Sequence, residues 1–180
     1  TAAAIKVGGT ISITNSGVGS ITGIISDGAS AAALTKAGNG TLTLTGTNTY
    51  TGNTSIAAGT GTLAIGTAGS LGGATGIYAG TIGIGAAATL SYASSADQTL
   101  SGVIGTANTA GLVTKSGTST LTLSADNIFT GDLTITAGTV VLSGSLDAAI
   151  NLGTGTTFTV TADITDKDVI SATANDGDVH

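Results

Sequence analysis

The amino-acid sequence predicts an all-β fold, a single right-handed parallel β-solenoid with about 20 residues per coil and roughly nine coils. Three observations lead to this expectation. Thr, Gly, Ala and Ser supply 36, 30, 28 and 17 of the 180 residues, which is too little side-chain volume for a wide globular core. A short strand-like pattern recurs along the chain, and a longer segment, 34–63, recurs at 113–142.

The short pattern is a Gly-Thr or Ser-Thr pair followed by alternating apolar residues, which is typical of a β-strand. It marks segments 9–13, 40–44, 61–65, 80–84, 119–123 and 138–142, with a related segment at 98–104. Because most steps between them are about one coil length or twice that, we expect the long repeat unit to hold four coils. Gly and Asn between the segments suit tight turns with positive φ.

The long repeat defines the expected organisation of the chain. We predict one domain over 1–180, with an entry coil at 1–19 and a first repeat unit at 20–98. A second unit at 99–180 runs into a truncated third. Stacked coils would bury rows of Ile, Leu and Val, so a thin core suffices.

Segments 34–63 and 113–142 carry the most similar part of the repeat, with 15 identities in 30 gapless positions. The first copy, LTKAGNGTLTLTGTNTYTG followed by an apolar strand and AGTGTL, resembles the passenger-associated strand repeat of autotransporters. The second copy is more diverged, with Ser119 and Phe129 in place of Gly and Tyr. The motif positions are Lys36, Gly40, Thr41, Leu42, Leu44, Asn48, Tyr50, Gly52, Lys115, Leu121, Leu123, Asn127, Phe129 and Gly131.

The resemblance implies a parallel β-helix that is exported through a bacterial envelope and displayed on, or released from, the cell surface. This localisation entails a targeting segment that has been removed. The large translocator barrel normal in that family is not contained in these 180 residues. Within the motif, we expect Asn48 and Asn127 to satisfy turn amides, and Tyr50 and Phe129 to fill the corner of a coil.

The composition argues against an enzyme. The sequence has no Cys, Arg or Glu, and its only imidazole is the last residue, His180, so neither thiol chemistry nor a held triad is available. The net charge of −6 with four Lys gives no footprint for nucleic acid, and no apolar run is long enough for membrane insertion. The scattered acids Asp27, Asp97, Asp126, Asp132 and Asp147 are interpreted as turn-capping or solvated groups.

No cofactor is expected, with calcium as the one weak alternative. Oxygen ligands for Ca²⁺ could come from a group of acids near the C-terminus, although no EF-hand spacing is present. The candidates are Asp163, Asp166, Asp168, Asp176 and Asp178. Solvated charge that protects a strand edge is the competing interpretation of the same residues.

The two ends of the sequence fall at matching phases of the repeat, which predicts head-to-tail stacking of the chain on itself. Thr173–Val179 resembles 106–113, the run before a motif, and 5–14 resembles 34–45 with a short deletion. Open solenoid ends expose unpaired strand edges that form filaments when they pair. The expected contact residues are Ile5, Lys6, Val7, Ile11 and Ile13 at one end, and Val169, Ile170 and Val179 at the other.

The leading functional expectation is therefore a non-enzymatic extracellular structural protein that stacks into surface or matrix fibres. The first alternative is part of an autotransporter adhesin whose face binds surface glycans or other cells. The second is ice binding through the Thr rows, since Thr stands at every other position over much of 41–54. Thr is also the ordinary outward residue of a soluble strand.

Overall fold

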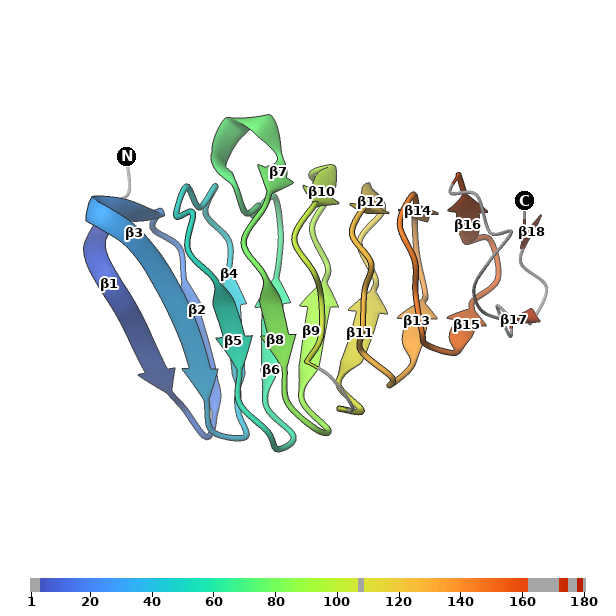
Figure 1. Cartoon of the computed structure of the whole chain (residues 1–180), viewed down its shortest axis with the longest axis horizontal. Coiled ribbons are helices and arrows are strands. Elements are labelled where there is room, and N and C mark those ends of the chain that lie inside the picture. Colours follow the sequence, from blue (N-terminus) through green and yellow to red (C-terminus); the bar gives the residue numbers. More distant parts are fainter. Residues whose placement is uncertain (1–3, 107–108, 162–171, 175–177, 180) are drawn as a thin grey trace.

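The computed structural model describes residues 4–106, 109–161, 172–174 and 178–179, which form a parallel β-solenoid (Figure 1). The axis of the coil runs from the N-terminal strands, in blue, to the C-terminal strands, in red. The predicted all-β solenoid is confirmed. The coil count is slightly lower than expected, at about 7 turns of roughly 22 residues.

Three parallel sheets make the walls, and the first of them lies in the N-terminal half. Sheet 1 has the order β1-β3-β5-β8. Its strands are β1 (Ile5–Thr14), β3 (Ile25–Ala37), β5 (Thr54–Ile56) and β8 (Ile82–Ile84). Isolated bridges, Ile82 with Ile104 and Asn127 with Leu146, continue this wall beyond β8.

Sheet 2 is the only one that runs along the whole described length, from β2 to β17. Its strands are β2 (Val18–Ile21), β4 (Thr41–Leu44), β6 (Thr62–Ile65), β9 (Thr89–Tyr92), β11 (Leu112–Lys115), β13 (Leu133–Ile135), β15 (Ile150–Leu152) and β17 (Ala172–Ala174).

Sheet 3 occupies the C-terminal half. Its strands are β7 (Ile77–Tyr78), β10 (Gln98–Leu100), β12 (Thr120–Leu123), β14 (Thr139–Leu142), β16 (Thr157–Val160) and β18 (Asp178–Val179). From β7 onward the chain visits sheet 3, the wall of sheet 1 and then sheet 2 in each turn. A short 3-10 helix, η1 (Gly73–Thr75), lies in the loop that stands out beside β7 in Figure 1.

The core consists of register-matched rows, because equivalent inward positions of successive strands lie one above another. In sheet 2, Leu42, Leu63 and Leu90 follow one another in a single row and are nearly fully buried. Outward positions of the same strands carry Thr, Ser or Ala. The alternation that predicted the strands therefore also separates the core from the surface.

The coil length is less regular than the sequence steps indicated. In sheet 2, Thr41 pairs with Thr62 and Thr62 pairs with Thr89, so the second of these turns is clearly longer than the first. The longer turn contains the loop with η1. The step from 61–65 to 80–84 is close to one predicted coil length, but it leads from β6 in sheet 2 to β8 in sheet 1.

The long repeat also does not hold four coils. Lys36 of the first copy lies in β3 of sheet 1, whereas Lys115 of the second copy lies in β11 of sheet 2. Likewise β4 belongs to sheet 2 and its counterpart β12 to sheet 3. One repeat therefore advances the chain by three turns and one further wall. The pattern shared by the two copies does not distinguish one wall from another, so sequence spacing alone gave the wrong phase.

Candidate functional site: an open strand edge and two buried corner motifs

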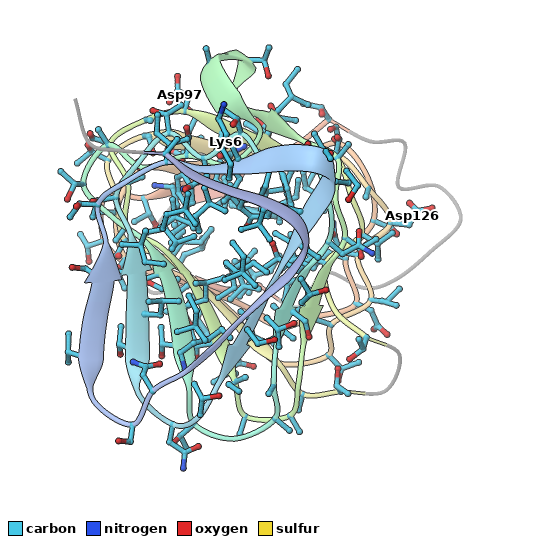
Figure 2. The ribbon with its side chains drawn as sticks, turned by 90° about the vertical axis from the view of Figure 1, so that its left-hand side faces the viewer. Lys6, Asp97 and Asp126 are labelled. Carbon is cyan, nitrogen blue, oxygen red and sulfur yellow. The ribbon has the colours of Figure 1, made fainter. Side chains whose placement is uncertain are left out.

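The N-terminal end of the solenoid offers two open strand edges, and Figure 2 looks directly at it. Within the described part of the chain, β1 pairs with β3 alone and β2 pairs with β4 alone. Amides alternate in direction along a strand. Since Asn15 donates to Ala37 on the β3 side, the amide of Ser12 points to the open side. Such an edge is a template for another strand.

The apolar end of the core is only partly covered there. Ile11 and Ile13 pack against the core but are half-buried, whereas Leu34, the register partner of Ile11, is 1% exposed. Ile5, whose register partner Ile25 is fully buried, is 41% exposed. An additional coil would cover these inward side chains. Val18 at the β2 edge is 90% exposed, but it lies in the outward row with Thr41.

The outer part of β1 is less suited to pairing. Lys6 is exposed on this strand, and the register with β3 shifts between Val7 and Gly9. Charges and bulges at an edge discourage further strands. The other predicted end carries less information: Val179 lies in β18 opposite Phe158, while Val169 and Ile170 lie outside the described residues.

Each repeat copy buries a lysine in the core. Lys36 stands in an inward row between Ile13 and Ile56, and Lys115 stands between Tyr92 and Ile135. Both side chains have 0% exposure, and burial lowers the pKa of both ammonium groups. This burial was not predicted, although in Leu34-Thr-Lys36 the lysine occupies the apolar phase of the strand.

The lysines satisfy the carbonyls of the turn that leaves the strand. Lys36 Nζ donates to the carbonyls of Ala37 at 2.9 Å and Gly38 at 2.7 Å. Lys115 Nζ donates to the carbonyl of Gly117 and lies 5.8 Å from the centre of the Tyr92 ring. The ammonium groups thus stabilise a corner where the backbone leaves the sheet and its carbonyls lack strand partners.

The asparagines form a second corner device with the same hydrogen bonds in both copies. Asn48 Oδ1 accepts from the amide of Ile25 at 3.0 Å, and Nδ2 donates to Gly46 at 2.8 Å and Ser70 at 3.1 Å. Asn127 repeats this pattern with Ile104 at 3.0 Å, Ala125 at 2.8 Å and Ser145 at 3.2 Å. Each amide joins three successive coils, which is the structural role expected from the turn.

Aromatic side chains fill the adjacent interior. Tyr50 and Phe129 both have 0% exposure, and the Tyr50 ring meets Tyr78 edge-on with centroids 5.5 Å apart. The Thr54 hydroxyl lies 2.7 Å from Tyr50 Oη and 2.8 Å from Tyr78 Oη, and Tyr78 donates to the Gly52 carbonyl at 2.5 Å. Burial raises the pKa of Tyr50 well above its usual range and the pKa of Tyr78 to about 12.

Gly40 shows why this corner has no room for a side chain. A side chain at Gly40 would collide with the backbone of Gly17 and Ser16 in the preceding coil. Gly17 itself has nothing within 4 Å of the place where a Cβ would stand. The coils therefore stack backbone on backbone at this point, and the GT pair of the first motif copy places a Gly there.

Four aspartates of the described chain link neighbouring coils. Asp27 accepts from the Thr51 hydroxyl at 2.7 Å, and hydrogen bonds, first that from the Ala32 amide, lower the pKa of its carboxyl group. Asp97 accepts from the Thr120 amide at 2.8 Å. Figure 2 places Asp97 and Asp126 at separate points on the rim of the coil.

Asp126 and Asp132 also link neighbouring coils. Asp126 accepts from the Ser145 hydroxyl at 3.1 Å, and Asp132 accepts from the Asn151 side-chain amide at 3.0 Å. Among the described residues no group of three or more His or acidic side chains could hold a metal ion. Of the calcium candidates, Asp178 lies in β18, and the other four fall outside the described residues: Asp163, Asp166, Asp168 and Asp176.

The outward Thr rows are interrupted. In sheet 2 the register row Val18, Thr41, Thr62, Thr89 and Leu112 begins and ends with an apolar residue. The Thr positions of the two motif copies also face different directions, because β4 and β12 belong to different sheets. The described surface thus presents no single Thr array shared by both copies.

Comparison with known families identifies the repeat. Residues 34–60 and 113–142 match the family model described as passenger-associated-transport-repeat, which confirms the predicted resemblance. Each matched segment carries one buried lysine, one buried asparagine and one buried aromatic residue of the motif. The repeat and the solenoid fit an autotransporter passenger repeat. Comparisons with curated proteins and with solved structures gave no match, and no helix in the described residues has the length and apolar character to span a membrane.

Proposed function

We propose that this chain is a structural passenger segment, exported to a bacterial cell surface, that acts by extending a rod and not by catalysis. The repeat family supports export, since passenger repeats belong to exported chains. The interior supports a structural role, because it consists of aliphatic rows, buried aromatics and lysines whose donors are taken up by carbonyls. Four aspartates are engaged between coils.

The rod grows by end-to-end association of molecules into fibres. The open edge of β1 and β2 is the observation that carries this proposal. Its free amides and carbonyls give directional pairing, and its half-buried Ile11 and Ile13 give apolar contact. Because the contact joins two different ends, it repeats without closing and produces a filament.

The test compares the wild-type chain with a variant that lacks one edge donor. We expect the purified protein to form filaments one solenoid wide by electron microscopy, and larger species as its concentration rises in analytical ultracentrifugation. Ser12→Pro removes an outward amide at an edge, where Pro is compatible with a strand. This variant should keep the wild-type circular dichroism spectrum and lose the filaments.

Ser12→Ala is the matched control, because it keeps the amide and should still assemble. A wild-type protein that stays monomeric at high concentration and shows no filaments would refute the proposal. So would a folded Ser12→Pro variant that assembles as well as Ser12→Ala.

A further inference from the structure

We propose that sheet 2 continues from one molecule into the next, with β2 of one copy pairing in parallel with β17 of another. This inference rests on the proposed end-to-end assembly and names its junction. The partner is a second copy of the same chain, and the contact is a main-chain ladder between two edges of equivalent sheets.

Sheet topology selects this pair of strands. Sheet 1 has one edge at the N-terminal end, but its other edge, β8, lies in the middle of the molecule. Sheet 3 begins at β7, also in the middle, and reaches only the C-terminal end. Sheet 2 alone presents an edge at both ends of the described structure, β2 at one and β17 at the other. Only this sheet can run unbroken through a stack.

The order of the walls continues across such a junction. The last described strand, β18, belongs to sheet 3, and the wall that follows sheet 3 in every turn is that of sheet 1. The first strand of a second copy, β1, belongs to sheet 1, and β2 then follows in sheet 2. A second copy on the C-terminal end would therefore continue the same order of walls.

The backbone groups on the β2 edge point the right way. Thr41 donates to Gly17 and Thr45 donates to Ile21, so the odd-numbered residues of this segment face β4. The amides and carbonyls of Val18 and Ser20 consequently face the open side. Val18 is also 90% exposed, and an added strand would cover part of it.

The register row of sheet 2 that contains Ser20 and Thr173 allows a test by disulfide cross-linking. The chain contains no Cys, so only introduced cysteines can react. Ser20 pairs with Thr43 at one end of a row in sheet 2, and Thr173 pairs with Asn151 at the other. In the proposed junction Ser20 of one copy stands opposite Thr173 of the next. Neighbouring strands lie about 4.8 Å apart, within the roughly 4.4–6.8 Å between Cα atoms that a disulfide spans.

The experiment mixes Ser20→Cys protein with Thr173→Cys protein under mild oxidation. We expect a disulfide-linked heterodimer, and a ladder of covalent oligomers from the variant that carries both changes. The control mixture replaces Thr173→Cys by Thr134→Cys. Thr134 lies in the same row but has strand neighbours at Thr114 and Asn151, so it should not cross-link to Ser20→Cys.

The outcomes separate this junction from assembly in general. Filaments without the Ser20–Thr173 link would overturn the junction and leave end-to-end assembly standing. Equal cross-linking in the Thr134→Cys control, or homodimers of Ser20→Cys alone, would also overturn it. Loss of both filaments and cross-links refutes the proposed function together with the junction.

Hydrogen exchange on the wild-type chain provides a measurement that needs no variant. The amides of Val18 and Ser20 should exchange rapidly in dilute monomer and at least tenfold more slowly in filaments. Filaments in which both amides exchange as fast as in the monomer would rule out pairing at β2.

Discussion

Replacing Asn48 by Ala should destabilise the solenoid by about 2–4 kcal/mol. The side chain is fully buried, and it is the acceptor for the amide of Ile25, which is itself buried. A buried amide left without a partner costs about 1–3 kcal/mol. The two lost donor bonds add less, because the Ser70 carbonyl still accepts from the Asn48 amide and the Gly46 carbonyl from the Ser70 amide.

The second copy supplies an internal replicate of this experiment. Asn127→Ala removes the same three bonds on a different wall, so its cost should agree with that of Asn48→Ala to within about 1 kcal/mol. The two losses should add in the double variant, because the residues share no partner. Asn53→Ala is the surface control: Asn53 is exposed, and water can replace its bond to Thr81, so we expect a change within about 0.5 kcal/mol.

Urea denaturation followed by circular dichroism gives the free energy of unfolding for each variant. Hydrogen exchange locates the effect, since the Ile25 amide should exchange faster in Asn48→Ala and unchanged in Asn127→Ala. The reasoning is refuted if Asn48→Ala costs no more than Asn53→Ala, or if the Ile25 amide stays equally protected.

Two further predictions concern the corner glycine and the buried phenols. Gly40→Ala should lower the midpoint of thermal unfolding by several degrees because of the collision with the preceding coil, whereas Gly17→Ala should leave it nearly unchanged; equal midpoints would contradict the stacking described here. Burial raises the pKa of every tyrosine, to about 12 for two of them. The stability that the buried phenols contribute is therefore fully present below pH 10 and is lost as the pH rises toward 12. The buried lysines, whose pKa is lowered, change the stability in the opposite direction. Absorbance at 295 nm should show no phenolate at pH 10.5 in the folded chain and substantial phenolate in urea, and early titration in the folded state would refute burial of Tyr50, Tyr78 and Tyr92.

The strands could be predicted from the sequence because each needs only local information. All six segments with the Gly-Thr or Ser-Thr pattern overlap a strand, for example β4 within 40–44 and β14 within 138–142. Alternation of apolar and small residues specifies an extended segment and its buried side. The parallel pairing followed from the repeat, since equivalent strands one coil apart can only stack in the same direction.

The phase of the coil could not be predicted in the same way. The segments 61–65 and 80–84 carry nearly the same pattern, yet β6 and β8 belong to different sheets. Side-chain alternation reports which side of a strand is buried and carries no information about which wall it joins. Only the hydrogen-bond register between coils distinguishes the walls, and that register depends on the length of every intervening turn.

The buried lysines show a second limit of sequence reasoning. A lysine is expected at the surface, so the burial of Lys36 and Lys115 was not predicted, although both are motif positions. Their stems fill the inward row like an aliphatic residue, while the ammonium groups reach the carbonyls of the next turn. This burial could not be predicted from the sequence, because the acceptors of the lysine hydrogen bonds are backbone carbonyls, which every residue has.

The advance of three turns and one wall per repeat has a consequence for how such a chain can lengthen. An extra copy of the long repeat unit would rotate everything after it by one third of a turn. The fold can absorb that rotation, because the lysine and asparagine corners work equally well between different pairs of sheets. Growth by unequal recombination would therefore preserve the rod while turning its downstream surface to a new side, and three added units would return that surface to its original direction.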